Sequence, residues 1–335
     1  MAKSSTAKAF DTITTNSVDM VRLEAGLYDE FRSDLNMLMR DVRAVTNRSE
    51  LEALRWATRL RTLDNIRDKV NTLIDGFYES VGSKLTESLR GVADVASQNA
   101  VSTITNGAAP SARRLASLPD RLRFQGATMQ EWLDGQAAAT AARVNTALGE
   151  SFASGSNLAQ TLSNVLGSTE LGFRDGAFGA SMREGRALIR TSVQATANAA
   201  RNMTWKSNSN KIAFLEWVSI LDGRTTPMCL VRAGKLYTLE GSPVGHGYSW
   251  GGGPGFLHWG CRSYSVPVYR MSDAMGDKAD YEDWLSDQSE DFQDETLGKT
   301  RAELFRNGQL GFSDLVNAHG TRPLNLKQIY KKIGG

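Results

Sequence analysis

Residues 211–229 read KIAFLEWVSILDGRTTPMC, and this stretch marks a change in the character of the chain. Bulky apolar and β-branched residues alternate in part with polar ones, which predicts a strand at about 213–220 that ends in the turn LDGR. Two later stretches, GKLYTLE at 234–240 and CRSYSVPVYR at 261–270, predict further short strands. In the last of them Pro267 cannot donate a ladder hydrogen bond, so this strand is expected at the edge of a sheet.

Upstream of this stretch the sequence has a helical pattern. From about residue 10 to 106 it contains no proline, and apolar residues recur at spacings of three and four, the period of an amphipathic helix. The two stripes are Tyr28, Phe31, Leu35, Leu38 and Val42, and then Leu63, Ile66, Val70, Leu73, Phe77 and Val81. They predict two long helices with a turn near Ser49 between them. Two interpretations stay open: the stripes pack helix on helix in one core, or part of a stripe docks on another protein.

Further helices are expected downstream. The stretch 106–126, with its prolines and arginines, predicts a linker or crossover, and helices are expected at about 128–150, from Ser156 and at 178–205. Residues 273–295 carry ten acidic side chains and a single lysine, which is typical of a solvated helical tail. Together these patterns predict an α+β protein of three parts, a helical region at 1–126, a small α+β domain at 127–270 and an acidic helical tail at 271–335.

The composition limits the function classes. Of 335 residues, 41% are hydrophobic and 23% charged, and 39 basic against 37 acidic residues give a formal net charge of +2. This balance is ordinary for a globular protein and requires no nucleic-acid or membrane partner. Four arginines, Arg113, Arg114, Arg121 and Arg123, keep nucleic-acid contact open beside the alternative of a solvated face. No apolar run has the length of a secretory signal or a transmembrane helix, so we expect a cytosolic chain with reduced thiols.

The only two cysteines, Cys229 and Cys261, lie in glycine-flanked loops together with His258. Zinc prefers thiolate and imidazole ligands, and the HWGC spacing lets His258 and Cys261 chelate one ion, with His246 or Asp222 as a fourth ligand. Three interpretations stay open: a zinc site, a disulfide formed in an oxidising medium, and two unlinked reduced thiols. Cys261 with His258 or His246 also has the residue types of a nucleophile and its base, although neither cysteine stands at an evident helix N-terminus that would lower its pKa.

The sequence has no phosphate-binding loop of the GxxxxGKS or GxxxxGKT type and no HExxH pair. Its one GxSxG stretch, GYSWG at 247–251, lies in the glycine-rich segment that is expected to be a loop, and not in the strand-turn-helix context of a nucleophile elbow. Paired carboxylates occur only in stretches that are expected to be solvated helices. The sequence therefore predicts a protein that is not an enzyme.

The order of residues across the two loops resembles the signature of the Mu F-like head morphogenesis, or minor capsid, proteins of tailed phages. A tryptophan strand, an aspartate with RT, a cysteine, a GK turn and a later H-x-x-C-R before a strand occur here in the family's order. The matching positions are Trp217, Asp222, Arg224, Thr225, Pro227, Cys229, Gly234, Lys235, His258, Cys261 and Arg262. The CxxC and CRC of the family are incomplete here, because Thr226 and Ser263 stand where a second thiol is usual.

Flanking segments extend the resemblance to about residues 128–325. Upstream, the stretch 187–201 has the family's RT at Arg190 and Thr191. Downstream, the WL-x-x-Q, Q and LG-x-x-R tail of related phage proteins is matched by Trp284, Leu285, Gln288, Gln293, Leu297, Gly298 and Arg301. Because each loop has lost one thiol, we expect positions 226 and 263 to face one another, as Cys229 and Cys261 would.

The resemblance implies a structural virion protein with a small Mu F-like α+β domain. Such a minor capsid protein lies in the capsid interior or at the portal vertex after assembly in the host cytoplasm, and acts with the portal protein and head proteins in head assembly and in DNA packaging or ejection. The motif residues then maintain the fold, none is catalytic, and zinc is the only cofactor left open. Genomic double-stranded DNA is a further partner that this role allows, and no membrane partner is expected. The N-terminal helices are the expected partner-binding element, and a zinc- or cysteine-dependent hydrolase centred on Cys229, His258 and Cys261 is the alternative.

Overall fold

The computed structural model describes residues 5–47, 56–220, 222–270 and 281–334. It is predominantly helical with small antiparallel sheets, which confirms the expected mixed α+β class. The α-helices are α1 (Ser5–Asn47), α2 (Trp56–Ser102), α3 (Ala112–Ala116), α4 (Leu118–Arg121), α5 (Met129–Ala153), α6 (Leu158–Leu166), α7 (Gly179–Ser207), α8 (Pro227–Leu230), α9 (Tyr281–Ser286), α10 (Glu290–Leu297), α11 (Lys299–Arg306) and α12 (Leu326–Ile333). The strands are β1 (Arg123–Phe124), β2 (Ala127–Thr128), β3 (Phe214–Val218), β4 (Leu236–Tyr237), β5 (Pro243–Val244) and β6 (Tyr264–Val268).

The chain forms two compact units by its internal contacts. The first unit comprises Met1–Met20, Gly91–Leu118 and Val193–Gly335, and the second comprises Val21–Arg90 and Pro119–Ser192. Helices α1, α2 and α7 each contribute residues to both units. This grouping differs from the expected ranges 1–126, 127–270 and 271–335, because three long helices each cross from one unit into the other.

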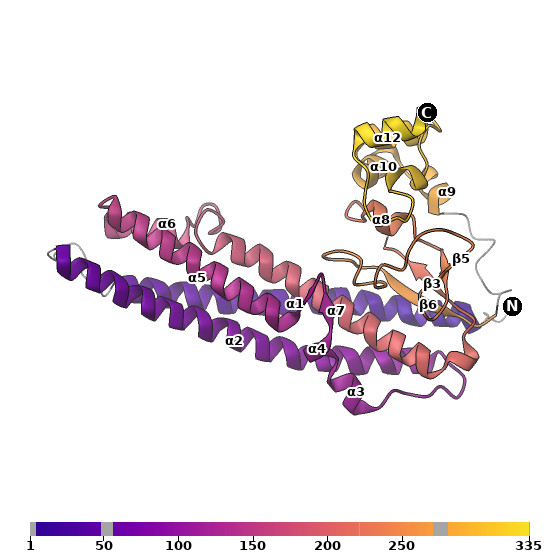
Figure 1. Cartoon of the computed structure of the whole chain (residues 1–335), viewed down its shortest axis with the longest axis horizontal. Coiled ribbons are helices and arrows are strands. Elements are labelled where there is room, and N and C mark those ends of the chain that lie inside the picture. Colours follow the sequence, from indigo (N-terminus) through magenta and orange to yellow (C-terminus); the bar gives the residue numbers. More distant parts are fainter. Residues whose placement is uncertain (1–4, 48–55, 221, 271–280, 335) are drawn as a thin grey trace. The chain divides into compact units, whose positions relative to one another are not determined.

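The core of the second unit is built from the two apolar stripes. Phe31 and Val42 on α1 and Val70 and Phe77 on α2 are buried, whereas Tyr28 and Leu73 are half-buried. The rings of Phe31 and Phe77 pack with their centroids 5.5 Å apart. Helices α5 and α6 lie alongside one another in the same unit (Figure 1). The stripes therefore pack helix on helix within the chain, which was the first of the two interpretations.

A buried polar network ties three helices of this unit together. The hydroxyl of Tyr78 on α2 lies 3.0 Å from Thr140 Oγ1 on α5, and that oxygen lies 2.8 Å from Ser181 Oγ on α7. Arg143 on α5 donates to Ser181 at 3.0 Å and to the Glu184 carboxylate at 3.0 Å. Because a buried polar group is costly when unpaired, this chain of hydrogen bonds specifies how α2, α5 and α7 are aligned.

The expected linker at 106–126 contains short regular elements. It holds α3, α4 and the first strand of the β1–β2 hairpin, in which Arg123 pairs with Thr128. The two turn residues Gln125 and Gly126 have φ of 51° and 93°, as a two-residue hairpin turn requires. The later helices begin close to their expected starts, α5 at Met129 and α6 at Leu158 after the N-cap Asn157. The turn predicted near Ser49 lies outside the described residues.

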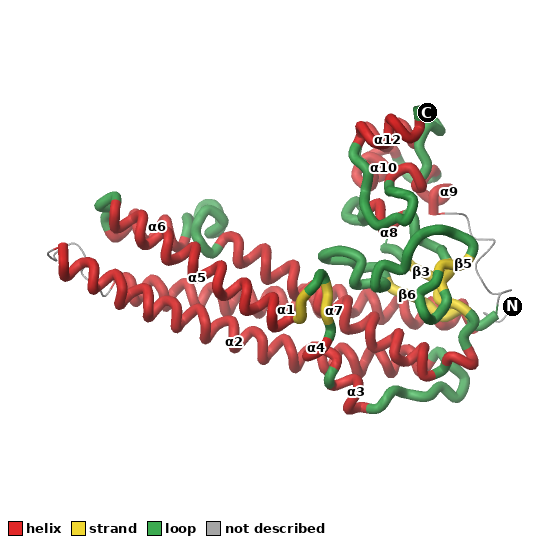
Figure 2. The backbone as a smooth tube through the Cα atoms, in the orientation of Figure 1, coloured by secondary structure: helices red, strands yellow, loops and turns green. Residues whose placement is uncertain are grey.

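The first unit contains a four-stranded antiparallel sheet with the order β5-β4-β3-β6. Figure 2 shows its strands β3, β5 and β6 in yellow. Strand β6 is therefore an edge strand, as Pro267 predicted, and Pro267 lies opposite Leu215 of β3. The glycine-rich stretch between β4 and β6 is mostly loop, with only the two residues of β5 in a strand. The sheet thus brings the segment after β3 and the segment before β6 to the same region.

Two apolar cores lie in this first unit. One joins the sheet to the helices through Ile13 of α1, Ala100 of α2, Trp205 of α7 and Val266 of β6. The other is formed by α8 and the C-terminal helices and includes Leu230, Val231, Leu285, Leu297, Ala302, Leu310, Phe312, Leu315, Val316, Leu324 and Ile329. The C-terminal segment contains the helices α9 to α12, as expected, with a longer non-helical stretch at 316–325, and it also packs an apolar face against α8. Residues 271–280 of the predicted acidic tail lie outside the described residues. None of the described helices contains an apolar stretch long enough to cross a bilayer.

Candidate functional site

The motif residues of the sequence lie around the end of β3 and the loops that follow it. Trp217 is on β3, and its backbone N–H donates to Lys235 O at 2.9 Å while its carbonyl accepts from the Gly234 N–H at 2.8 Å. Gly234 has a φ of 74°, a conformation that favours glycine, so this residue lets the chain return from α8 to pair β4 with β3. Cys229 lies on the short helix α8, and Cys261 comes three residues before β6.

Trp217 is the centre of an aromatic cluster. Its side chain is fully buried, with ring centroids 6.1 Å from Tyr237 and 5.4 Å from Trp250. The indole Nε1–H donates to Ser219 Oγ at 3.1 Å, and the Ser219 hydroxyl donates to the carbonyl of Cys229 at 2.8 Å. The polar edge of the tryptophan is thus satisfied, and through Ser219 it fixes the position of α8.

Asp222 organises the turn after β3. Its carboxylate accepts from the Arg224 backbone N–H at 3.0 Å and from the Arg224 guanidinium at 3.2 Å. The largely buried guanidinium of Arg262 donates to both carboxylate oxygens of Asp222, and the distance to Oδ2 is 2.7 Å. Thr225 Oγ1 accepts from the Asp222 N–H at 3.2 Å. Partial burial by itself would raise the pKa of Asp222, but the hydrogen bonds from Arg262 and Arg224 outweigh it and hold that pKa well below its ordinary range.

The ion pair of Asp222 with Arg262 predicts a dependence of stability on pH. Because the pKa of Asp222 is lowered in the folded protein, the pair stabilises the fold above the unfolded pKa of about 3.9, and this contribution is lost as the pH falls below that value. We therefore expect Asp222→Asn to melt at a lower temperature than the wild type at neutral pH and to approach it as the pH falls toward about 2. Thermal melts of both proteins across this range measure the difference, and a gap independent of pH would contradict the role of the carboxylate.

Cys229, His258 and Cys261 come together in the first unit, and their ligand atoms all lie within 4.8 Å of one another. The two sulfurs are 3.8 Å apart, and His258 Nε2 lies 3.1 Å from Cys229 Sγ. Both cysteines are buried and unlinked, and His258 is half-buried. The Gly255 N–H donates to Cys261 Sγ at 3.4 Å. These distances describe two thiols and an imidazole in contact, not a disulfide, whose sulfurs lie about 2.05 Å apart.

The hydrogen bonds around His258 determine which ring nitrogen is free. His258 Nδ1 lies 2.9 Å from the carbonyl of Trp259, and since a carbonyl only accepts, Nδ1 carries the proton. The lone pair of Nε2 then faces Cys229 and the Thr226 hydroxyl, which lies 3.0 Å away. The hydrogen bond with the Cys229 thiol lowers the pKa of Cys261 despite its burial, while the neighbouring Cys261 and burial raise the pKa of Cys229.

This donor set fits a zinc ion. Two thiolates on a tetrahedral zinc with bonds of about 2.3 Å lie about 3.8 Å apart, and the sulfurs of Cys229 and Cys261 have this separation. A metal-bound imidazole commonly donates its other N–H to a carbonyl, as His258 does to Trp259. Cys229, Cys261 and His258 would hold the ion, which would cross-link the segment after β3 to the segment before β6.

The other two candidate ligands have different roles. His246 lies 2.9 Å from the carbonyl of Leu236 through Nε2 and accepts from the Tyr248 N–H at 3.2 Å through Nδ1, so both ring nitrogens are engaged. Burial lowers the pKa of His246, which keeps the ring neutral. Asp222 is held by Arg262. Among the described residues the cluster therefore has three ligands, and the sequence expectation of His246 or Asp222 as the fourth is not met.

Thr226 and Ser263, which stand where the resembled signature has cysteines, both lie beside the cluster. Thr226 contacts His258, and Ser263 Oγ lies 3.3 Å from the Ser219 hydroxyl that also bonds the Cys229 carbonyl. Both hydroxyls also lie within hydrogen-bonding reach of the Cys229 thiol. The expectation that positions 226 and 263 face one another stays a prediction.

One buried residue of this site has no signal in the sequence. Arg232 is fully buried, and its guanidinium donates to the carbonyls of Met228, Ser249, His319 and Gly320 at distances from 2.6 to 3.3 Å. It also lies over the Trp217 ring, 5.6 Å from the centroid. Arg232 thereby joins α8, the glycine-rich loop and the C-terminal segment. A single arginine in a loop predicts none of this, because its acceptors are backbone carbonyls far away in the chain.

Several of the flanking motif residues contact other residues of their own unit. Gln293 donates to the carbonyls of Leu285 and Gln288, both at 3.0 Å, and so closes the turn between α9 and α10. Leu285 and Leu297 lie in the apolar core of the C-terminal helices. Upstream, Arg190 pairs with Glu24 at 3.5 Å within the second unit. These contacts maintain the helices and bring no further side chain to the cysteines.

Comparison with known proteins does not identify the chain. No family model, no curated protein and no solved structure matches it.

Proposed function

We propose that this chain is a structural virion protein, a minor head component that acts at the portal in head assembly and in DNA packaging or ejection. One observation carries the proposal: residues of the resemblance that lie up to 40 positions apart in the sequence contact one another. Trp217 is linked through Ser219 to Cys229, Cys229 contacts His258 and Cys261, and Arg262 holds Asp222. A chance similarity in residue order would not be expected to fall on one connected site.

The partner-binding element in this proposal is the outer surface of the long helices. The apolar stripes themselves are buried in the chain, so they are not available to a partner. On α1, Leu23 and Met37 are apolar side chains that remain exposed. We assign the portal contact to this outer face of α1.

The experiment mixes the full chain with a purified portal ring of the same phage and detects the complex by pull-down and electron microscopy. A truncation of the N-terminal helices would be a poor test, because Ile13, Ala100 and Ile104 belong to the core that covers the sheet. Point variants avoid this problem. Leu23→Glu with Met37→Glu should abolish binding, since burying two carboxylates without a partner is costly.

The matched control carries Leu326→Glu and Tyr330→Glu, which change two exposed residues of α12 in the same way. It should bind the portal like the wild type. Failure of the wild-type chain to bind the ring would overturn the proposed function. Equal loss of binding in both double variants would overturn the assignment to α1.

The alternative function, a zinc- or cysteine-dependent hydrolase, has one observation in its favour. His258 Nε2 lies 3.1 Å from Cys229 Sγ, within reach for a base and a nucleophile. The pKa of that thiol is raised, however, and both sulfurs are buried, whereas a nucleophile must meet its substrate. We therefore propose a fold-maintaining role for this cluster and rank hydrolysis second.

A further inference from the structure

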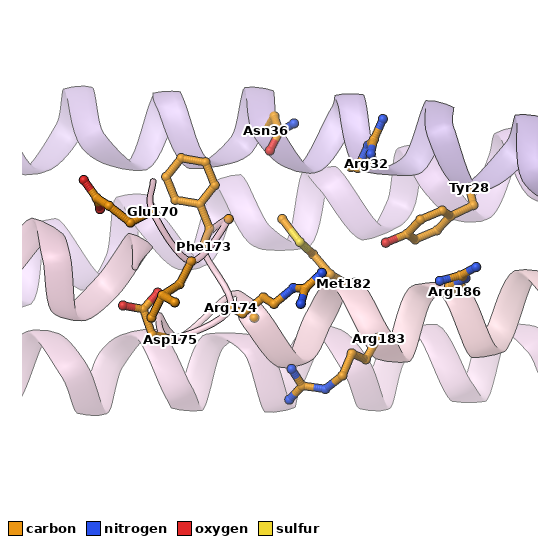
Figure 3. Close-up of a pocket in the computed structure, with 13 residues that line it drawn as sticks. Tyr28, Arg32, Asn36, Glu170, Phe173, Arg174, Asp175, Met182, Arg183 and Arg186 are labelled. Atoms are coloured by element: carbon orange, nitrogen blue, oxygen red, sulfur yellow. The ribbon is translucent and has the colours of Figure 1, made fainter. Parts of the chain in front are cut away.

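An open groove lies in the second unit between α1, α7 and the loop that precedes α7. It has a volume of about 1000 Å³. Figure 3 shows Arg32 on one side, Arg183 and Arg186 on the facing helix, and Phe173 and Arg174 between them. The groove is far in sequence from the cysteine cluster, and none of its residues belongs to the motif.

The groove carries an excess of positive charge. Four arginines line it, against the two acidic residues Glu170 and Asp175, which lie together at one end in Figure 3. The Asp175 carboxylate is already used, because it accepts from the Ser168 N–H at 2.9 Å and this bond lowers its pKa. The cationic part of the groove is therefore not neutralised by its own acids.

The four arginines differ in how far they are engaged. Arg32 lies 3.3 Å from Asp29 in an exposed pair, and Arg186 lies over the Tyr28 ring, 5.3 Å from its centroid. Within the part of the chain that the structure describes, Arg174 and Arg183 have no carboxylate within 4.0 Å. The N–H donors of these two guanidinium groups can therefore bind an anionic ligand. A planar guanidinium matches the oxygens of a phosphate in two parallel hydrogen bonds.

Phe173 enters the groove from a strained position. Its φ is 62°, a left-handed conformation that is rare for a bulky side chain. The preceding residue, Gly172, also has a positive φ of 57°. Such a conformation costs about 1–3 kcal/mol and is found preferentially where a ligand is held. In this groove it directs an aromatic ring, half-buried and beside Arg174, to the space between the helices (Figure 3).

We propose that this groove binds a single strand of nucleic acid. The strand's phosphates contact the guanidinium groups of Arg174 and Arg183, with Arg32 and Arg186 on either side, and one base stacks on the ring of Phe173. Proteins that hold single strands combine these two features, a cationic groove for the backbone and aromatic faces for the bases.

The aromatic ring favours a single strand over the other polyanions. In a duplex the bases are already paired and stacked on one another, so the ring of Phe173 has no free base face to stack on. An acidic peptide would use the arginines but has no base to stack on Phe173. This inference does not rest on the proposed role at the portal, because the groove and the outer face of α1 at Leu23 and Met37 are tested with different variants and different probes.

The experiment measures fluorescence anisotropy of a labelled single-stranded DNA of mixed sequence, about 20 nucleotides long, with the full chain between about 50 and 200 mM salt. Arg174→Ala with Arg183→Ala should weaken binding at least about tenfold and lower the slope of log affinity against log salt by about 1.4, since each phosphate contact with a single strand contributes about 0.7. Arg174→Lys with Arg183→Lys should keep most of the slope. Phe173→Gly should weaken binding about tenfold without lowering the melting temperature, because glycine accepts the left-handed backbone.

The control is Lys327→Ala with Lys331→Ala, which removes the same charge from exposed positions on α12. This control should bind the DNA with an affinity within about twofold of the wild type. A general effect of net charge would instead lower the DNA affinity of both double variants alike. Equal loss in both pairs, or no loss in the groove pair, would overturn the assignment to the groove. Displacement of the strand by an equal concentration of polyglutamate would show an acidic-protein site instead. A duplex of the same sequence that binds as tightly, with no effect of Phe173→Gly, would overturn the stacking role and the preference for a single strand.

Discussion

Replacing Trp217 by alanine is expected to cost about 3–5 kcal/mol of unfolding free energy, the usual range for removing a buried aromatic side chain. Trp217 has no exposed surface and packs against Tyr237, Trp250 and the guanidinium of Arg232. Its loss would leave a cavity under the sheet and remove the donor to Ser219. The unfolding free energy of a folded protein is typically about 5–15 kcal/mol, so this single substitution should remove a large fraction of it.

Urea unfolding followed by far-ultraviolet circular dichroism measures this cost, because that signal does not depend on tryptophan fluorescence. Trp259→Ala is the matched control: its side chain is 38% exposed, and the carbonyl that accepts from His258 is kept. We expect the control to stay within about 0.5 kcal/mol of the wild type. Similar midpoints for both variants would show that the aromatic cluster contributes little to stability.

Zinc binding at the cysteine cluster is the second large effect that we expect. Protein purified without chelator should contain stoichiometric zinc by elemental analysis, because Cys229, Cys261 and His258 are already arranged with the sulfur separation of a tetrahedral site. Removing the ion with a strong chelator should lower the melting temperature. The stabilisation lost would be about 4 kcal/mol if free zinc had exceeded its dissociation constant a thousandfold.

Two variants separate the ligands from their neighbours. Cys261→Ser should lose the zinc, whereas His246→Gln should retain it, because both ring nitrogens of His246 are already in hydrogen bonds. Chelator should then change the melting temperature of His246→Gln and leave that of Cys261→Ser unchanged. Full zinc content in Cys261→Ser would contradict the proposed ligand set. Absence of zinc from the wild-type protein would contradict zinc binding, and the cluster would then be a contact of two thiols and an imidazole without a metal.

The helical part of the fold could be predicted from the sequence because its information is local. The spacing of Phe31, Val42, Val70 and Phe77 already identifies the buried faces, and these residues are buried in the structure. Pro267 identified an edge strand for an equally local reason, its missing N–H. Each of these predictions needed only a few neighbouring residues.

The candidate site could be predicted only in part, since its geometry depends on distant segments. The sequence singled out both His246 and His258 as candidate ligands. Nothing in their spacing shows that Leu236 and Tyr248 engage both ring nitrogens of His246. Nor does it show that the Trp259 carbonyl binds Nδ1 of His258 and leaves Nε2 available to a ligand. Arg232 was missed because it bonds carbonyls up to 88 residues away. The grouping into two units could not be predicted either. Hydrophobic periodicity identifies a long helix, but it does not show at which residue the helix stops packing in one unit and starts packing in the other.

The core of the first unit also has a consequence for synthesis on the ribosome. Thr14 of α1 bonds Tyr264 of β6, a residue made 250 positions later, and Ile13 beside it packs against that strand's region. At about 5–20 residues per second, the early helix waits roughly 10–50 s for the strand that completes its surroundings. Until then the part of its apolar face that meets β6 lacks its native cover, even after Ala100 and Trp205 have been made. Productive folding of this protein in a cell should therefore depend on a chaperone that covers the first twenty residues, or on slow, dilute expression.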